Sequence, residues 1–190
     1  MESNHFTGLI SKSLCLLAGI CFLIAGCAPK AETAQYNCGE FSFSYSPKEY
    51  ALTEENVDGD LTSVILYSLE KPFNRLEFNI FRYKPEMVET ILPADMVGEL
   101  NLDVEQVSER ATAGLEITDQ SGLLATGRPG RTYEACNIMA VKDENGTEAL
   151  VSVTSTQVAH YNIIAIAWAE SEEKIGKFAE VFESYQVSLP

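Results

Sequence analysis

The most informative segment of the sequence is Tyr161-Asn162-Ile163-Ile164-Ala165-Ile166-Ala167-Trp168, in which one amide side chain interrupts an apolar and aromatic run. Because successive side chains of a strand point to opposite faces of a sheet, this run predicts a central strand that is buried on both faces. A helix is expected directly after it, since Ser171 is a good N-cap and is followed by two glutamates that suit a positive first turn. The expected buried stripe of this helix consists of Ile175, Phe178, Ala179, Phe182 and Tyr185.

Segments on the N-terminal side predict further strands. In Phe41-Ser42-Phe43-Ser44-Tyr45 aromatic and polar residues alternate strictly, which is the period of a half-buried strand. Leu76, Phe78 and Ile80 alternate with polar residues in the same way and are expected to face inward. Other strands are expected at residues 64–69, 115–117, 132–141 and 149–156, the last two joined by the turn Asp143-Glu144-Asn145-Gly146.

A second helix is expected between these strands. Its apolar positions repeat at helical spacing after Pro93 and are Met96, Leu100, Val104 and Val107. Two helices combined with six to seven mostly antiparallel strands predict an α+β fold, in which the sheet packs between the helices.

The N-terminus has the features of an export signal. Residues 14–25 form an apolar run that, at about 1.5 Å per residue, is too short to cross a hydrocarbon core of roughly 30 Å. The run ends in Leu23-Ile24-Ala25-Gly26-Cys27, which resembles the lipobox of bacterial lipoproteins. The resemblance implies cleavage after Gly26 and thioether lipidation of Cys27. An ordinary cleaved signal or an uncleaved anchor helix is the alternative interpretation.

These features divide the chain into three parts. Residues 1–26 are expected to be a lipoprotein signal peptide, residues 27–37 a lipidated tether, and residues 38–190 the α+β domain. The tether is small and polar, so it is expected to hold the domain off the bilayer. The expected location is therefore the bacterial cell membrane, with the domain lipid-anchored on the extracytoplasmic face.

Acidic residues dominate the composition. The chain of 190 residues has 28 Asp and Glu against 13 Lys and Arg, and its net charge of -15 excludes nucleic acid as an expected partner. Binding a polyanion requires clustered basic groups that displace counterions. We instead expect a partner whose surface offers basic groups to this acidic domain.

Two segments near the ends of the domain resemble those of PsbP-like domains. The first is Phe41-Ser42-Phe43-Ser44-Tyr45-Ser46-Pro47, where a strand ends in Tyr-x-Pro, and the second is Phe178-Ala179-Glu180-Val181-Phe182-Glu183-Ser184-Tyr185, where a helix ends in a Ser-aromatic pair. The order of elements between them also fits, over about residues 38–189, although Tyr50 replaces a Trp that often follows the Pro. The resemblance implies an antiparallel sheet between helices, and relatives that mostly act as binding or assembly subunits without catalysis of their own.

Few residues of the expected domain suit catalysis or metal binding. Once residues 1–26 are removed, His160 is the only histidine, and its apolar neighbours indicate a structural or strand-end residue. Cys38 and Cys136 form either a disulfide, as in many exported domains, or two free thiols. Because a zinc site needs about four clustered ligands, we expect no metal site, no cofactor and no enzyme activity.

Two charged segments are the candidate binding surfaces. The acidic segment 54–60, with Asp58 and Asp60, is either a solvated loop or a weak Ca²⁺ site, and it lacks the spacing of an EF-hand. Arg128 and Arg131 flank a turn and form the densest positive spot in the sequence. We expect a non-catalytic protein-binding or assembly module that acts on another extracytoplasmic protein. The alternative is a small-ligand or ion-binding lipoprotein associated with a transporter.

Overall fold

The described residues form two antiparallel sheets and two helices. The computed structural model describes residues 32–58, 60–82, 93–121, 124–128, 131–158 and 160–188, all within the unit Glu32–Pro190. The expected signal peptide, Cys27 and the first part of the tether lie outside the described residues. Within the described part of the chain, no helix is both long and apolar enough to cross a membrane.

The larger sheet has eight strands and is antiparallel throughout. In spatial order its strands are β3 (Tyr50–Asp58), β4 (Leu61–Ser68), β5 (Arg75–Arg82), β10 (Tyr161–Ala169), β9 (Glu148–Val158), β8 (Arg131–Lys142) and β6 (Glu116–Gln120), and β7 (Leu124–Arg128) also pairs with β8. The β8–β9 hairpin turns at Gly146, whose φ of 83° is a conformation that glycine adopts without strain.

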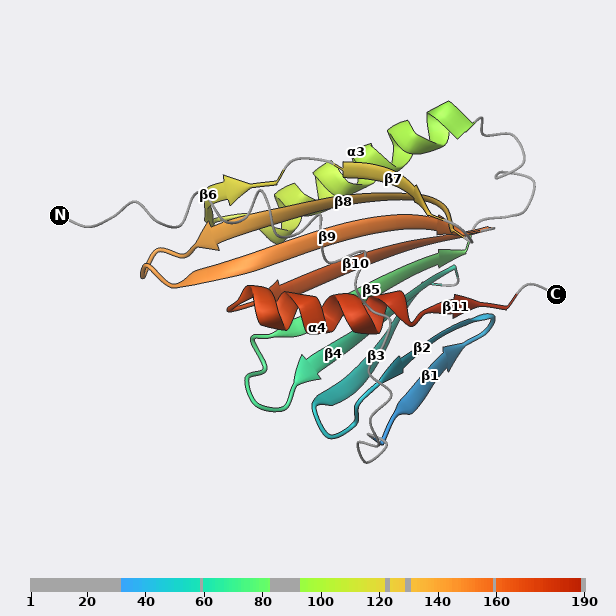
Figure 1. Cartoon of the computed structure of the whole chain (residues 1–190), viewed down its shortest axis with the longest axis horizontal. Helices are drawn as coiled ribbons and strands as arrows, with labels where there is room; N and C mark the ends of the chain where they lie inside the picture. Colours follow the sequence, from blue (N-terminus) through green and yellow to red (C-terminus); the bar gives the residue numbers. More distant parts are fainter. Residues whose placement is uncertain are drawn as a thin grey trace, which may run out of the picture. The chain divides into compact units, whose positions relative to one another are not determined.

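The smaller sheet and the helices cover the two faces of the large sheet. The smaller sheet consists of β1 (Ala34–Cys38), β2 (Phe41–Tyr45) and β11 (Gln186–Val187). In Figure 1, helix α4 (Glu172–Glu183) crosses one face of the large sheet beside this small sheet. Helix α3 (Pro93–Ala111) covers the opposite face, over β8 and β9.

Strand β10 separates two hydrophobic cores. All nine of its residues are buried, as the sequence predicts for a central strand. Ile163 belongs to the core beneath α4 and the small sheet, whereas Ile164 and Trp168 belong to the core beneath α3. The α4 core is rich in aromatic rings, and the ring centroids of Phe43 and Phe78 lie 4.5 Å apart in a stacked arrangement. The apolar run of β10 therefore supplies side chains to both cores.

Most of the expected elements are present, and three strands differ from expectation. Residues 34–37, which the sequence analysis assigns to the tether, form most of β1 and pair with β2. The acidic segment 54–58 is not a loop but continues β3, because its backbone pairs with β4 in the register Glu54↔Val64 and Glu55↔Ser63. An edge strand tolerates polar and charged residues, so the absence of apolar alternation does not exclude one. Strand β7 was not expected either, and the described residues form eleven strands in place of the expected six to seven.

The helices follow the expected patterns with two corrections, at Ala179 and at Tyr185. Tyr185 is buried but lies beyond Glu183, where α4 ends. Leu100, Val104 and Val107 of α3 are buried, and in α4 so are Phe178 and Phe182. Ala179 is exposed, contrary to expectation, and Val181 takes its place in the buried stripe. The reason is that Val181 lies one turn after Phe178 on the same face, whereas Ala179 points about 100° away from it.

Candidate functional site

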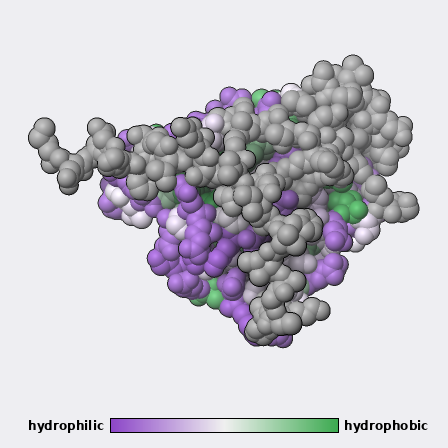
Figure 2. Space-filling model, in the orientation of Figure 1, coloured by the Kyte–Doolittle hydropathy of each residue, from purple (hydrophilic) through white to green (hydrophobic). Residues whose placement is uncertain are grey.

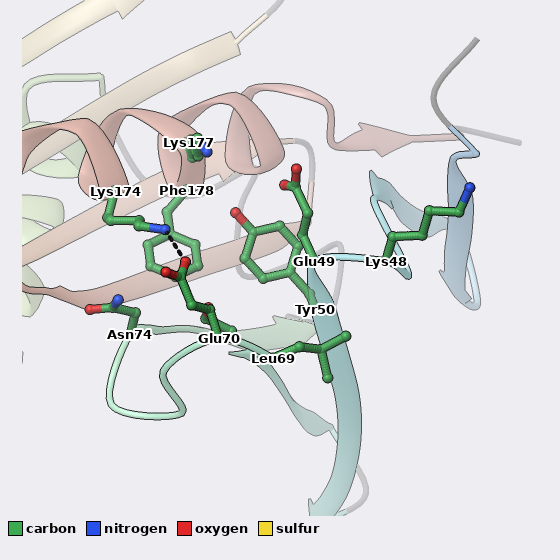
Figure 3. A pocket seen from close by; sticks show the side chains of 10 residues that line it. Lys48, Glu49, Tyr50, Leu69, Glu70, Asn74, Lys174, Lys177 and Phe178 are labelled. Carbon is green, nitrogen blue, oxygen red and sulfur yellow. Dashed lines mark hydrogen bonds and ion pairs between the residues drawn. The ribbon is translucent and has the colours of Figure 1, made fainter. Parts of the chain in front are cut away.

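A pocket of about 220 Å³ lies between α4 and the turn that joins β4 to β5 (Figure 3). Its lining combines two aromatic rings, one buried amide and a group of paired charges. The lining residues are Lys48, Glu49, Tyr50, Ser68, Leu69, Glu70, Asn74, Lys174, Lys177 and Phe178. They come from three parts of the chain: the turn before β3, the β4–β5 turn, and the first two turns of α4.

The β4–β5 turn is fixed to the end of β10. The backbone N–H of Asn74 donates to the Lys71 carbonyl at 2.9 Å, and the N–H of Ser68 donates to the Asn74 carbonyl at 2.8 Å. Glu170, just after β10, donates its backbone N–H to Asn74 Oδ1 at 3.0 Å, and its carboxylate pairs with the Lys71 ammonium. The pocket wall on this side is therefore held by the strand that forms the centre of the domain.

Helix α4 forms the opposite wall. Ser171 caps the helix, and its Oγ accepts the backbone N–H of Lys174 at 3.4 Å. Lys174 and Phe178 lie four residues apart and therefore share one face of the helix. In Figure 3 both side chains point toward the β4–β5 turn. The local sequence of α4 thus places an ammonium group and an aromatic ring side by side in the pocket.

The aromatic part of the pocket is formed by Tyr50 and Phe178. Their ring centroids lie 5.6 Å apart at an interplanar angle of 42°. Burial raises the pKa of Tyr50 above its ordinary value, and the neighbouring Glu49 carboxylate adds to the effect. The phenol therefore remains neutral at physiological pH and can donate a hydrogen bond.

Ion pairs surround the pocket. Lys174 Nζ lies 2.9 Å from Glu70 Oε2, and the dashed line in Figure 3 marks this contact. The hydrogen bond between them, with their mutual attraction, lowers the pKa of Glu70 and raises that of Lys174. At the rim, Lys48 pairs with Glu32 at 3.2 Å and Lys177 with Glu173 at 3.8 Å.

The gathering of charged residues at this pocket was not foreseen from the sequence. Four of the 13 basic residues of the chain lie at or beside the pocket, namely Lys48, Lys71, Lys174 and Lys177. They are far apart along the chain, so only the fold brings them together. The positive spot expected at Arg128 and Arg131 is local in sequence and contains two residues.

Asn74 forms the deepest polar group of the pocket. The residue is 1% exposed, and its Oδ1 accepts the N–H of Glu170. Its Nδ2 is buried and has no hydrogen-bond partner among the described residues. In Figure 3 the amide nitrogen lies on the side of Lys174, and the oxygen points away from the other labelled side chains. A buried donor without a partner is unfavourable, so an acceptor entering the pocket would satisfy it.

Two exposed apolar side chains stand beside the pocket. Leu69 is 56% exposed and Phe73 is 50% exposed, and both belong to the β4–β5 turn. In Figure 2 a small hydrophobic spot interrupts the hydrophilic surface over this turn. Exposed glutamates of the same region surround it, among them Glu49, Glu70, Glu170 and Glu173. Large aromatic and aliphatic side chains with a charged rim are typical of the centre of a protein interface.

A hydrogen-bonded cluster lies at the other end of the large sheet. The Tyr161 hydroxyl donates to Glu40 Oε2 at 2.7 Å, and His160 Nε2 lies 3.3 Å from the same oxygen. Burial and the bond to Glu40 raise the pKa of Tyr161 to about 12, whereas the bond from Tyr161 is the main cause that lowers the pKa of Glu40. His160 thus lies directly before β10, with its ring next to Glu40 of the β1–β2 turn.

The structure places the residues of the expected binding surfaces at this same end of the sheet. Asp58 ends β3, and Asp60 is exposed in the turn that follows. Arg128 ends β7 and pairs in register with Arg131, the first residue of β8. Four strand spacings of about 4.8 Å separate β4 from β8, so the acidic and basic pairs lie about 20 Å apart and form no common site. Among the described residues, no group of three or more His, Cys, Asp or Glu could hold a metal ion.

The disulfide alternative for Cys38 and Cys136 does not hold in the structure, because neither cysteine is part of a disulfide. Cys38 Sγ lies 3.5 Å from Thr62 Oγ1 in β4, whereas Cys136 lies in β8 and its Sγ accepts from Thr154 Oγ1 at 3.4 Å. Four strand spacings, about 20 Å, separate β4 from β8. A disulfide requires Cα atoms within about 7 Å, so these two thiols remain apart.

Comparison with solved structures identifies the fold. The domain matches cyanobacterial PsbP (CyanoP) from Synechocystis sp. PCC 6803 with a TM-score of 0.56, over 86% of this chain and 97% of that chain, at 13% sequence identity. The chain has a PsbP-like fold. The order of elements expected from the two terminal segments is thereby confirmed at the level of the fold. At this identity the likeness concerns the fold alone.

Two further solved structures are similar at lower TM-scores. A protein of Bacteroides thetaiotaomicron matches with a TM-score of 0.45 and 10% identity, over 79% of this chain and 46% of that chain. A protein of unknown function from Pseudomonas aeruginosa matches with a TM-score of 0.33 and 10% identity, over 80% of this chain and 91% of that chain. No protein-family model matches the sequence. No curated protein matches it either.

Proposed function

We propose that this protein is a lipid-anchored, extracytoplasmic module that binds another protein and has no catalytic role. The lipobox-like segment that ends in Cys27 supports the anchor, and the PsbP-like fold supports a binding or assembly role. The single observation that carries the proposal is the exposed apolar pair Leu69 and Phe73, which protrudes from an otherwise charged surface. A partner that covers these two side chains would remove their apolar surface from water, which favours association.

The partner is a protein with a basic rim around an apolar depression. Leu69 and Phe73 would enter the depression, and the surrounding glutamates would face the basic rim. Burying a half-exposed Phe and Leu removes apolar area from water at about 25 cal/mol per Å², which makes this turn the expected energetic centre of the interface. The acidic net charge of the domain would also speed association with a basic partner.

Site-specific photo-crosslinking in intact cells tests this proposal. A benzoyl-phenylalanine crosslinker replaces Phe73 in the membrane-anchored protein, and captured proteins are identified by mass spectrometry. The matched control carries the same crosslinker in place of Ile117, which is 46% exposed but lies on the edge strand β6. We expect position 73 to capture one recurrent partner at near-equal abundance, and position 117 to capture none.

Two outcomes of the crosslinking experiment would contradict the proposal. Equal capture at both positions, or no capture at position 73 by a folded and membrane-bound protein, would contradict the docking surface. The alternative function, a small-ligand lipoprotein that serves a transporter, has its own observation in the pocket beside this turn.

A further inference from the structure

We propose that the pocket between α4 and the β4–β5 turn binds a small monocarboxylate with an apolar body. The carboxylate takes the place of Glu70 beside Lys174 Nζ and accepts a hydrogen bond from Asn74 Nδ2. The apolar body lies against the rings of Tyr50 and Phe178. This inference is independent of the protein partner proposed above, because it concerns the inside of the pocket and not its exposed rim.

The pair Lys174–Glu70 indicates the charge of the ligand. Lys174 is the less exposed partner, with 23% of its side chain exposed, and it sits on the capped first turn of α4. Glu70 is 72% exposed and belongs to a turn. An exposed ion pair of this kind contributes little to stability, so another carboxylate can replace Glu70 without disturbing the fold. Glu70 therefore acts as an internal substitute for the ligand.

Asn74 provides the second, independent observation. Its Oδ1 is committed to the N–H of Glu170, which fixes the orientation of the amide. Its Nδ2 is left as a buried donor without a partner among the described residues, on the side of Lys174, and Asn74 lines the same pocket. A carboxylate oxygen satisfies this donor, whereas a metal ion or an ammonium group does not. The buried amide thus selects for an acceptor.

Size and net charge restrict the ligand further. A volume of about 220 Å³ is below the usual range of roughly 300–1,000 Å³ for drug-sized ligands, which indicates a small acid. The carboxylates of Glu49 and Glu70 oppose the lysines at the rim, so a single negative charge is favoured over a double one. The tilted rings of Tyr50 and Phe178 provide an apolar surface for an aromatic or branched body.

Binding of phenylacetate to the full chain in detergent micelles tests the proposal. Saturation-transfer NMR measures the dissociation constant of phenylacetate, and phenylacetamide serves as the neutral isostere. We expect phenylacetate to bind at least about tenfold more tightly than phenylacetamide, because a hydrogen bond to a charged group is stronger than one to a neutral group. Equal binding of the two compounds would overturn the proposal.

Three variants test the residues, and they act in opposite directions. We expect Glu70→Gln to tighten phenylacetate binding by about threefold, since it removes the competing internal carboxylate. Lys174→Gln should weaken binding by about tenfold because the charged donor is lost. Asn74→Asp retains the acceptor for Glu170 but replaces the donor with a second negative charge, and should weaken binding by a similar factor, about tenfold.

The controls keep the outcome independent of folding. Glu109→Gln removes an exposed glutamate of α3, on the opposite face of the large sheet, and it should leave binding unchanged. If Lys174→Gln or Asn74→Asp fails to fold, Glu70→Gln still tests the proposal. Glu70 is an exposed turn residue, so its substitution should not prevent folding. Weaker or unchanged binding in Glu70→Gln would overturn the proposal.

A free acid and the C-terminus of a peptide carry the same carboxylate. Titration with acetyl-Ala-Phe, which has a free C-terminal carboxylate, distinguishes the two sources. Tighter binding of phenylacetate indicates a free acid, and tighter binding of the peptide indicates a chain terminus. Either ranking supports the carboxylate site, whereas no binding of either compound would overturn it. A failure of crosslinking at position 73 would leave these measurements unaffected.

Discussion

Asp103 is a carboxylate at the boundary between helix α3 and the large sheet. Its Oδ2 accepts Nδ2 of Asn162 at 2.7 Å, and Oδ1 of Asn162 accepts the Ser155 hydroxyl at 3.0 Å. Burial raises the pKa of Asp103, and the nearby Glu99 carboxylate raises it further, whereas the bond from Asn162 acts in the opposite direction. The hydrogen bonds therefore compensate only in part for the loss of hydration.

This raised pKa predicts how the free energy of unfolding depends on pH. The folded state binds the Asp103 proton more tightly than the unfolded state does, so protonation favours folding. The contribution of Asp103 is most favourable below its ordinary pKa of about 3.9. It is lost as the pH rises through the higher folded pKa. Replacing the carboxylate with an amide removes this penalty at neutral pH.

We therefore expect Asp103→Asn to raise the free energy of unfolding at pH 7 and to have little effect near pH 4. The amide oxygen can still accept the bond from Asn162, so the contact between α3 and the sheet is retained. Urea unfolding of both proteins at the two pH values measures the difference. A lower stability of Asp103→Asn at pH 7 would show that the ionised carboxylate contributes more than its burial costs.

Asp143 is a control for Asp103, because its pKa is shifted in the opposite direction. Its carboxylate accepts the backbone N–H of Thr147 at 2.7 Å and that of Asn145 at 2.9 Å, and these bonds lower its pKa. Its stabilising contribution is present above the ordinary pKa and is lost as the pH falls through the lowered one. Asp143→Asn should therefore not raise the stability at pH 7.

Elements with a clear periodicity could be predicted from the sequence, and elements without one could not. Strand β10 was predictable because both of its faces are buried, and α4 because Ser171 and a buried stripe define it. Strand β3 was not, since its acidic residues resemble a solvated loop and only the pairing with β4 makes them a strand. Whether a strand lies at the edge of a sheet depends on how the whole sheet assembles, so the local sequence pattern of β3 could not predict it.

The cap of α4 leads to a prediction for a whole element. Removing the Ser171 hydroxyl leaves the N–H of Lys174 without its side-chain acceptor, so Ser171→Ala should lower the free energy of unfolding by about 1 kcal/mol. Ser171→Asp supplies another acceptor and should restore most of this loss. Chemical denaturation of the three proteins measures both effects. Equal destabilisation by Ala and Asp would mean that the hydroxyl acts in some way other than capping.

The pocket could not have been predicted from the sequence, for a reason that concerns the whole molecule. Its lining comes from residues 48–50, 68–74 and 174–178, which are far apart in the chain and carry no shared motif. The expected sites at Asp58, Asp60, Arg128 and Arg131 were chosen because their charges are adjacent in sequence. Charges that are adjacent in sequence can be recognised as a charged turn. The pocket, in contrast, forms only where two turns distant in sequence pack next to α4, and the sequence does not show which turns do so.

Attachment to the membrane is a prediction for the complete chain. We expect the protein extracted from membranes to begin at Cys27 and to carry a diacylglyceryl group on its sulfur, as the lipobox-like segment implies. Two or more acyl chains would anchor it stably, since each buried CH₂ contributes about 0.8 kcal/mol. Intact-mass measurement checks both statements, and Cys27→Ser provides the unprocessed control. An unmodified Cys27 in the extracted protein would contradict the anchor.

The position of β10 has a consequence for the order in which the protein can fold. The strand in the middle of the large sheet comes from residues 161–169, so it is among the last parts of the chain to be synthesised. Until it is available, the sheet segments β3–β5 and β6–β9 have no strand to join them, and neither core is complete. Closing a sheet through contacts so distant in sequence is slow. We therefore expect the chain to remain unfolded through most of its synthesis, which is the state in which a polypeptide can be threaded across a membrane.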